Sequence, residues 1–365
     1  MKTIFINHTN NCFGAEQVML KLLDCCPLEK EEIIVVEPSY TEQSGFAEKI
    51  SEKQLRLIRL KYKNIGGSIW RSLLVILYNI PALIKLIGLA KKEKVQCVYS
   101  NTSVTCLGIM LAKCLKVKHI WHIHEPVERE HGFSHQIVPL YRHYLCYRKN
   151  TIVFAAQKQQ KQWLSLFPGI NSIVIDNPIN DCSVRHKVEN RVCRFGFVGS
   201  MDKRKNVPSI INAFEKLLDE NKEYRLYLTK NTGDEEQVVS DMIKAKKMEY
   251  AVSVERYANI ADMFRQIDVL LLPSFSETWG MVVLEAMICG IPSVVTTHSG
   301  LTNLLTDNEE VIFVDPYDID ALTNAMRRIA DPKVQERLSE KGKKLLENKD
   351  FNGNFIKKVT MLFEQ

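Results

Sequence analysis

The sequence predicts an α/β protein made of two doubly wound domains, each a parallel sheet covered by helices on both faces. The chain has 365 residues, enough for two ordinary domains of this class. Short apolar segments alternate along it with segments of helical periodicity, which is typical of parallel sheets buried on both faces. This alternation starts again after residue 190, and apolar (45%) and charged (25%) residues are balanced as in globular proteins.

In the first half, KTIFIN (2–7) is predicted to form a strand, and a turn containing Gly14 leads into a helix over EQVMLKLL (16–23). Further strands are expected at EEIIVVEP (31–38), VQCVYSN (95–101), VKHIWHIHE (117–125), NTIVFAA (150–156) and SIVIDNP (172–178). Helical patterns separate nearly all of these strands, as crossover connections between parallel strands require.

The second half repeats this arrangement. Strands are expected at VCRFGFVGS (192–200), YRLYLTK (224–230), YAVSVE (250–255), IDVLLLPS (267–274), IPSVVTT (291–297) and EVIFVD (310–315). In the segment 206–218, apolar residues at 207, 210, 211, 214, 217 and 218 form one helical face, with Asn206 as the N-cap and Pro208 in the first turn. The polar segment 176–191 is the expected boundary between the domains. Ligands of such sheets bind beyond the carboxyl ends of the strands, so two facing domains would hold a ligand in the cleft between them.

The segment 69–90 is apolar and is long enough for a membrane span. A basic cluster follows it. Arg71, Pro81 and Lys85 argue against a simple span. The favoured prediction is a buried helix or a pair of helices bent at Pro81. A surface helix that touches the membrane interface is the second prediction, and a true span is the third.

The N-terminal apolar run is too short for a signal peptide, and the ten cysteines form no CxxC pair. These features predict reduced thiols in a cytoplasmic protein. The net charge is unevenly distributed. Residues 1–180 hold 23 Lys and Arg against 14 Asp and Glu, and the segment 53–118 holds 13 basic residues and one acidic residue, Glu93. This basic half suggests an anionic partner such as phosphate groups or a membrane surface, and solvated lysines on helix faces are the alternative.

Two loops carry the residues expected to do chemistry. FSETWG (275–280) joins a buried strand to the helix MVVLEAMIC (281–289), so Glu277 lies on a loop at a carboxyl end and Glu285 lies within the helix. The loop amides and the helix N-terminus suit an anion, and carboxylates accept hydrogen bonds from sugar or ribose hydroxyls. The other loop, GSMDKRKN (199–206), places a basic cluster before a helix, which suits a diphosphate. Helix capping and ordinary solvation are the alternative interpretations of these residues.

Together these segments resemble a family. PSFSETWGMVVLEAMICGIPSVVT is similar to the Glu-x7-Glu region of GT-B glycosyltransferases of family 4, and FGFVGSMDKRKNVPSIINAF is similar to their phosphate-loop region. The first half of the chain contains four further segments in the order that the family shows: FGAEQVMLKLL, YSNTS, WHIHEP and VIDNPIN. The resemblance implies two Rossmann-like domains facing across a cleft. Residues 1–178 would form the acceptor-side domain and 179–349 the donor-binding domain, with a C-terminal helix at about 350–365 packed back on the first.

The resemblance also implies a retaining hexosyltransferase that needs no metal or other cofactor. It would move a sugar from a nucleotide-diphosphate sugar to a glycan or lipid-linked acceptor in cell-surface polysaccharide synthesis. By position, His124 and Glu277 would be catalytic, and the donor would be bound by Gly14, Ser200, Arg204, Lys205, Glu277, Thr278, Trp279, Gly280, Met281 and Glu285. Such an enzyme is expected to be cytoplasmic, at the inner face of the plasma membrane.

The chain departs from the family's pattern at three positions. Ser200 stands where arginine is common, Asn206 where glycine follows the lysine, and Asn303 where glutamate is frequent. These changes leave open a catalytically silent sugar-nucleotide or glycan-binding protein. A nucleic-acid partner is disfavoured because apolar segments interrupt the basic ones and the second half is acidic.

Two further patterns are candidate metal-binding sites. One is the histidine cluster His119, His122, His124, His131 and His135, and the other is DID at 318–320. The histidine spacing fits no familiar zinc pattern. DID has the form of a metal-binding Asp-x-Asp motif, but capping of the following helix and interaction with its dipole are the preferred interpretation. No metal is expected.

Overall fold

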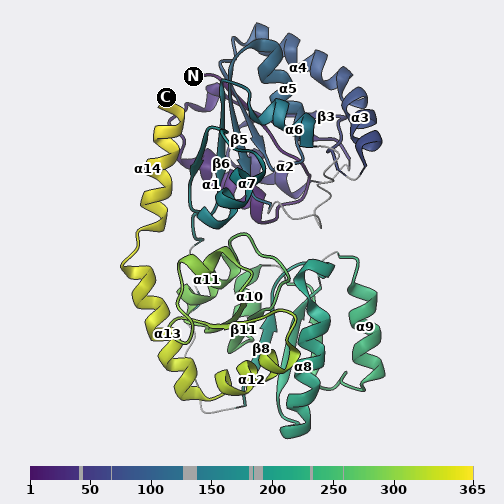
Figure 1. Ribbon diagram of the computed structural model, residues 1–365, viewed down its shortest axis with the longest axis vertical. Coiled ribbons are helices and arrows are strands. Elements are labelled where there is room, and N and C mark those ends of the chain that lie inside the picture. The colour runs from purple at the N-terminus through teal and green to yellow at the C-terminus, as the bar shows by residue number, and fades with distance from the viewer. Residues whose placement is uncertain are drawn as a thin grey trace. The chain divides into compact units, whose positions relative to one another are not determined.

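The computed structural model describes residues 1–40, 44–66, 68–125, 138–180, 184, 192–230, 233–257 and 259–364 (Figure 1). The chain forms two compact units. The N-terminal unit comprises Met1–Pro178 and Asn352–Gln365, and the C-terminal unit comprises Ile179–Phe351.

The N-terminal unit is built on a seven-stranded sheet in the order β3-β2-β1-β4-β5-β6-β7, and all of its strand pairs are parallel. The strands are β1 (Thr3–Ile6), β2 (Ile33–Pro38), β3 (Arg56–Leu60), β4 (Cys97–Asn101), β5 (Lys118–Ile123), β6 (Asn150–Phe154) and β7 (Ser172–Val174). The helices are α1 (Gly14–Cys25), α2 (Gly45–Glu52), α3 (Ile69–Tyr78), α4 (Ile80–Lys92), α5 (Cys106–Leu115), α6 (Val138–Leu145), α7 (Gln157–Leu166) and α14 (Phe351–Glu364), with a 3-10 turn at Lys30–Glu32.

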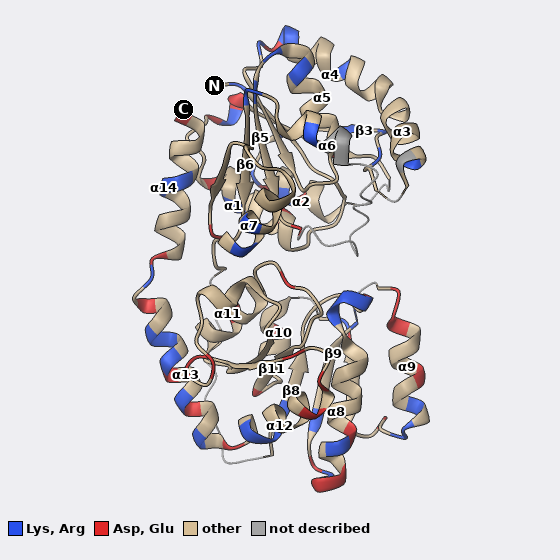
Figure 2. Cartoon of the chain, in the orientation of Figure 1, with Lys and Arg blue, Asp and Glu red and all other residues tan. Residues whose placement is uncertain are grey.

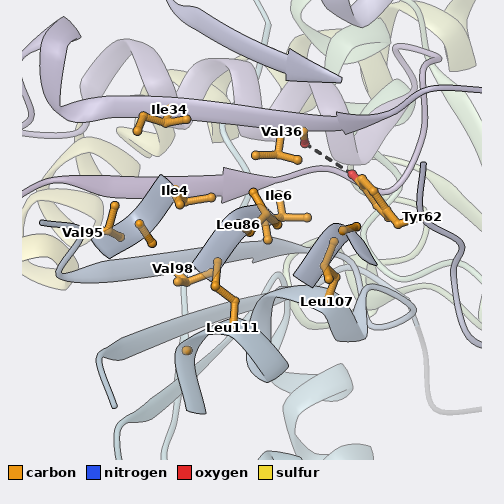
Figure 3. Packing of buried hydrophobic residues seen from close by; sticks show 13 residues of the cluster. Ile4, Ile6, Ile34, Val36, Tyr62, Leu86, Val95, Val98, Leu107 and Leu111 are labelled. Atoms are coloured by element: carbon orange, nitrogen blue, oxygen red, sulfur yellow. Dashed lines mark hydrogen bonds between the residues drawn. The ribbon is translucent and has the colours of Figure 1, made fainter. Parts of the chain in front are cut away.

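The period-two geometry of β1 explains why helices cover both faces of this sheet. Ile4 and Ile6 point to the face where α4 and α5 pack, and there they join a buried apolar cluster that includes Leu86 and Leu111 (Figure 3). Phe5 points to the opposite face, where its ring centroid lies 5.9 Å from that of Phe363 on α14. β1, which is apolar from Ile4 to Ile6, is therefore buried on both sides.

The C-terminal unit has a six-stranded parallel sheet in the order β10-β9-β8-β11-β12-β13. Its strands are β8 (Arg194–Phe197), β9 (Arg225–Thr229), β10 (Val252–Glu255), β11 (Val269–Leu272), β12 (Ser293–Thr296) and β13 (Ile312–Val314). Its helices are α8 (Val207–Glu220), α9 (Glu236–Ala245), α10 (Ile260–Phe264), α11 (Met281–Cys289), α12 (Ile319–Ile329) and α13 (Pro332–Glu347), with 3-10 turns η4 (Lys203–Lys205) and η5 (Gly300–Asn303).

This architecture confirms the predicted fold class of two doubly wound units. The expected strands of both halves are present, and α8 buries the six apolar positions predicted for its inner face. One strand was not predicted. β3 is only partly buried, and two arginines interrupt its sequence RLIRL, so it lacks the continuous apolar run of the inner strands.

The apolar segment 69–90 forms the predicted bent pair of helices. α3 and α4 meet at an angle of 44°, and the break falls at Asn79, with Pro81 in the first turn of α4. Within the described part of the chain, no single helix is long and apolar enough to cross a membrane, and only this bent pair passes by length and composition. The expectation that the segment is buried is wrong for its outer face, where Trp70 is 75% exposed.

Among the cysteines that the structure describes, Cys289 differs from the expectation of reduced thiols. Free thiols are found at Cys12, Cys25, Cys26, Cys97, Cys106, Cys114, Cys146 and Cys193, whereas Cys289 at the end of α11 is disulfide-bonded. Burial raises the pKa of Cys97 and Cys106 to about 12, so these two thiols are protonated and unreactive at neutral pH.

Candidate functional site

The site residues of the C-terminal unit lie on the loops that follow β8 and β11. These strands are neighbours in the sheet although β9 and β10 separate them in sequence. The strand order reverses between them, which makes this point the topological switch where doubly wound sheets bind ligands. The loop after β8 contains η4, and the loop after β11 contains Glu277 and leads into α11.

The loop after β8 is held in place by Asn206. This residue has a φ of 56°, a left-handed conformation that asparagine tolerates better than most other non-glycine residues. Its side-chain amide donates to the carbonyl oxygens of Pro273 and Pro316 at 3.1 and 2.8 Å, and the amide of Phe275 donates to the Arg204 carbonyl at 2.8 Å. Asn206 therefore precedes α8 as predicted, but its side-chain amide links loops and does not cap the helix.

Two cations of this loop meet one carboxylate. Lys205 Nζ lies 2.6 Å from Glu277 Oε2, and Arg204 Nη1 lies 3.6 Å from the same oxygen. Arg204 also donates to the carbonyl oxygen of Ser276 at 3.1 Å. The side chains of Lys205 and Glu277 are each only 12% exposed, so solvent screens their interaction weakly.

The neighbouring polar residues differ in where they point. Ser200 Oγ donates to Asp202 Oδ2, and a guanidinium nitrogen of Arg204 lies 3.7 Å from the same Asp202 oxygen. Lys203 is exposed, and its backbone amide bonds Asp234. Arg204, and not Lys203, therefore supplies the second cation beside Lys205.

The loop from Glu277 to Gly280 has a fixed backbone. The Glu277 amide donates to the His298 carbonyl, and the Glu277 carbonyl accepts from the Gly300 amide at 3.0 Å. Gly280 has a φ of 79° and precedes the first turn of α11. Thr278 and Met281 are half-buried beside it. Helix N-termini leave amides without an intrahelical acceptor and carry a partial positive charge, so this turn suits an anion.

Trp279, between these residues, is 7% exposed, and its indole Nε1 has no hydrogen-bond partner among the described residues. A buried donor without a partner is rare in proteins and marks a position where a ligand atom or water would complete the hydrogen bonding.

Glu285 is a buried carboxylate inside the apolar helix α11. It is 8% exposed, and its Oε1 accepts a hydrogen bond from Asn180 Nδ2 at 2.7 Å. Burial raises the pKa of this carboxyl above its ordinary value, and the Asn180 hydrogen bond offsets part of the shift. A buried carboxylate with few hydrogen-bond donors around it is well suited to accept hydrogen bonds from hydroxyl groups.

The N-terminal unit has a second polar network at its own switch point, beyond β1 and β4. Asn101 donates through Nδ2 to Asn7 Oδ1 at 2.9 Å and to Glu16 Oε1 at 3.3 Å. Asn101 Oδ1 lies 3.0 Å from His124 Nε2. Because Nδ2 is the donor in the first two contacts, Oδ1 must accept, and the network selects the Nε2-protonated tautomer of His124. The Nδ1 atom of His124 is then a hydrogen-bond acceptor.

Burial sets the charge of the histidines in this network. It lowers the pKa of His124 well below its ordinary value, with smaller contributions from His122 and His8, so His124 is neutral at pH 7. Burial also lowers the pKa of His8, but the hydrogen bond and charge of Glu16 outweigh it and the net pKa is raised. His8 Nδ1 lies 3.0 Å from Glu16 Oε1, a carboxylate with no exposed surface.

The remaining expected residues lie as follows. Gly14 begins α1, and a Cβ atom placed there would meet nothing within 4 Å, so the space beside it is open. Asn303 is exposed at the end of η5. Asp318 caps α12 by accepting from the Ala321 amide at 2.8 Å, as the capping interpretation predicted.

The histidine cluster shows no metal geometry in the described residues, which contain no group of three or more His, Cys, Asp and Glu that could hold an ion. His119 and His122 are buried with pKa values lowered to about 3, and they bond Ser100 and Tyr99 at 2.8 and 2.7 Å. His131 and His135 lie outside the described residues.

Sequence reasoning missed Asn180 and Asn101, which contact Glu285 and His124. It also missed Glu16 and His8, which extend the network around Asn101. Asn101 and His8 end or directly follow apolar strands, and polar residues at the carboxyl ends of strands are the signal that could have identified them. Nothing in the spacing of Asn180 or Glu16 indicates their partners Glu285 and Asn101, because these pairs are 105 and 85 positions apart in the chain.

Comparisons with known proteins agree with this description. Residues 185–345 match the family model described as glycosyl transferases group 1. A segment of 167 residues is 29% identical to mannosylfructose-phosphate synthase of Agrobacterium fabrum, and covers 41% of this chain and 37% of that protein. A segment of 151 residues is 27% identical to O-antigen chain mannosyltransferase B of Escherichia coli, and covers 40% of this chain and 39% of that protein. Each match thus spans less than half of the relative.

The solved structure of Anabaena HepE in complex with UDP and glucose superimposes over 100% of both chains with a TM-score of 0.83 at 17% sequence identity. A likeness at this identity establishes the fold alone. The chain therefore has the GT-B fold of two Rossmann-like units, and its residues 185–345 match the model of glycosyl transferases group 1.

Proposed function

We propose that this chain is a retaining glycosyltransferase of family 4 that moves a hexose from a nucleotide-diphosphate sugar to a glycan or lipid-linked acceptor in cell-surface polysaccharide synthesis. The observation that carries the proposal is the cluster of Lys205, Arg204 and Glu277 beside the N-terminus of α11, with Glu285 buried in the same helix. A nucleotide-sugar donor presents a diphosphate and two sets of hydroxyls, and these groups match cations, helix amides and carboxylates.

In the proposed complex, the diphosphate lies between Lys205, Arg204 and the amides of Thr278 to Met281. Glu285 accepts from the ribose hydroxyls in place of, or beside, the Asn180 amide. Glu277 accepts from the hydroxyls of the transferred sugar. The names of the relatives support a sugar-transfer reaction, since one is an O-antigen chain mannosyltransferase, and the HepE complex with UDP makes UDP the first nucleotide to test.

The proposed reaction breaks the bond between the anomeric carbon and the diphosphate oxygen and forms a bond from that carbon to an acceptor oxygen. The acceptor proton passes to the departing diphosphate on the same face of the sugar, which retains the anomeric configuration. Negative charge grows on the diphosphate as the bond breaks. Lys205, Arg204 and the helix N-terminus stabilise this charge, a role that a divalent metal fills in other phosphate sites.

His124 is proposed to contact the transferred sugar. It is neutral, and the Asn101 network directs its protonated Nε2 away, so Nδ1 is the atom that accepts from a sugar hydroxyl. The polar groups around it come from the ends of β1, β4 and β5, where a doubly wound unit holds its ligands.

The test begins with a panel of nucleoside diphosphates measured by calorimetry, followed by turnover of the matching nucleotide sugars with and without EDTA. We expect one base to bind, slow donor hydrolysis without acceptor, and unchanged rates in EDTA. Proton NMR of the released sugar should show the anomeric configuration of the donor. Binding without turnover of any donor would favour the silent binding protein, and loss of activity in EDTA would contradict the metal-free reaction.

A further inference from the structure

The helix pair α3–α4 presents large apolar side chains to solvent. Trp70, Leu74 and Ile84 are 75%, 67% and 63% exposed. The exposed large apolar side chains that the structure describes on this pair are here called the α3–α4 face. They are Trp70, Leu73, Leu74, Leu77, Tyr78, Ile80 and Ile84. An ordinary surface helix carries polar residues on its outer side, so a helix that is apolar on both sides needs a second apolar surface to cover it.

The face points outward because the opposite side of the pair is fixed to the core of the N-terminal unit. Val75, Ala82 and Leu86 are buried there. At the break between the helices, the Asn79 side chain accepts from the Lys63 amide and donates to the Lys63 carbonyl, both at 2.9 Å. These contacts hold the pair flat on the unit, as in a helix that lies on a membrane surface and does not span it.

The surroundings of the face are strongly basic (Figure 2). Exposed cations on the same segment are Lys61, Lys63, Arg71, Lys85, Lys91, Lys92 and Lys94. The one acidic residue between 53 and 94 is Glu93, which is already paired with Lys2 at 2.6 Å and Arg56 at 2.9 Å. The net charge around the face is therefore positive and available to an anionic partner.

A cavity of about 690 Å³ adjoins the face. Its lining includes Arg59, Lys61 and Lys85 together with the apolar side chains of Leu77, Tyr78 and Pro81. Cations over an apolar wall match the phosphate and the upper acyl chain of a phospholipid. Arg59 is partly neutralised by buried Glu37 at 2.8 Å, which leaves the two lysines as the main phosphate ligands.

We propose that the α3–α4 face docks on an anionic lipid leaflet, with the Lys61–Lys85 cavity receiving a lipid phosphate. The combination of apolar side chains with a ring of cations fits this partner and opposes self-association. In a symmetric dimer, the same basic surface would face itself. The inference is independent of sugar transfer, because vesicle binding is measured without donor or acceptor and either proposal can fail alone.

Trp70 provides a direct readout on the unmodified chain. The other three tryptophans, Trp121, Trp163 and Trp279, are at most 7% exposed, so a change in emission on adding vesicles reports on Trp70. We expect a blue shift with phosphatidylglycerol vesicles, quenching by lipids brominated on the acyl chain, and little change with phosphatidylcholine alone. Co-sedimentation with an unshifted Trp70 emission would overturn the proposed orientation.

The apolar contribution is tested with the double variant Leu74→Ser and Ile84→Ser. Both side chains are mostly exposed, so the fold should be unaffected, and vesicle affinity should fall by about 10-fold or more. The matched control is Val238→Ser with Ile356→Ser, whose side chains are 48% and 47% exposed on other helices. An equal loss in both double variants would contradict a specific face.

The charge contribution is tested with Lys61→Gln and Lys85→Gln together. Two lysines near an anionic leaflet should contribute about 30-fold in affinity, and the loss should shrink in high salt. The control is Lys216→Gln with Lys222→Gln, two exposed lysines of the other unit. Unchanged binding of the Lys61 and Lys85 variant would exclude the phosphate cavity. A dimer in sedimentation without lipid, lost on Leu74→Ser and Ile84→Ser, would assign the face to a second copy instead.

Discussion

Glu285→Gln is expected to stabilise the unliganded protein while weakening its binding of nucleotide. Wild-type Glu285 is 8% exposed within the apolar helix α11, and its carboxylate accepts one hydrogen bond, from Asn180 at 2.7 Å. Leaving a buried charged acceptor short of partners costs roughly 1–3 kcal/mol, and the Asn180 bond offsets part of it. A glutamine keeps an acceptor oxygen for Asn180 without the charge. A net gain of about 1 kcal/mol corresponds to about 2–4 °C in melting temperature for a domain of 150–250 residues.

The effect should depend on pH in a definite direction. Burial places the folded-state pKa of Glu285 above its ordinary value of 4.5. For a raised pKa, the stability that the group contributes is complete below the unfolded-state pKa and is lost as the pH rises through the folded-state pKa. The advantage of Glu285→Gln over wild type should therefore be small below pH 4.5, grow as the pH rises through the folded-state pKa, and then stay constant toward pH 7.

Nucleotide binding should respond in the opposite sense. A hydrogen bond from a ribose hydroxyl to a carboxylate contributes roughly 1.5–3 kcal/mol, or about 10–150-fold in dissociation constant. Thermal unfolding from pH 4 to 8 and calorimetry with UDP measure the two effects, with Glu249→Gln, an exposed residue of the same unit, as the control. A wild type more stable than Glu285→Gln at pH 7 would refute the burial argument. An unchanged UDP affinity, with UDP binding the wild type, would refute the ribose contact.

Three further outcomes are expected. Lys205→Met should weaken nucleoside diphosphate binding by about 30-fold or more, since it removes one cation of a mostly buried charge cluster, whereas exposed Lys216→Met should leave the calorimetric titration unchanged. Gly14→Ala should alter the free energy of unfolding by less than about 0.5 kcal/mol because the space beside it is open, yet slow turnover if the diphosphate approaches there; normal turnover would remove Gly14 from the site. Gly280→Ala should lower the free energy of unfolding in urea more than Gly169→Ala. Both glycines have a positive φ, but of the two only a Cβ atom at 280 would meet a neighbour, the Leu301 side chain at 3.0 Å. Equal losses of stability would show that backbone strain alone decides the effect.

The expected positions of Lys205 and Glu277 followed from a basic loop after one strand and an acidic loop after another. That two such loops are adjacent depends on β8 and β11 pairing across an intervening pair of strands. The family resemblance predicted that these two loops belong to one site. Periodicity alone predicts strands and helices but not the order of the strands in a sheet. Arg204 shows the limit of this reasoning. Residue type alone does not distinguish the three basic residues at 203–205, and only the resemblance named Arg204 and Lys205. In the structure, η4 places Arg204 and Lys205 near Glu277 and leaves Lys203 exposed.

The buried partners could not be predicted for the same reason. The contact between Asn180 and Glu285 joins residues 105 positions apart, and the contact between Asn101 and Glu16 joins residues 85 positions apart. No local pattern specifies such a pair, because each depends on how the chain folds between them. The α3–α4 face was similarly ambiguous, since an apolar run suits a core helix, an interfacial helix or a span.

The sequence by itself determined the α/β class, the two-domain organisation, nearly every strand, the bend near Pro81 and the capping of α12 by Asp318. These features depend on local periodicity, backbone preference and side-chain chemistry within a few residues. Only the tertiary structure decided which side of α3 and α4 faces solvent, that Lys205 and Glu277 are in contact, and that Glu285 is buried with Asn180 as its partner. Those properties arise from the packing of distant segments, which sets burial and hydrogen-bond partners and through them the charge of each group.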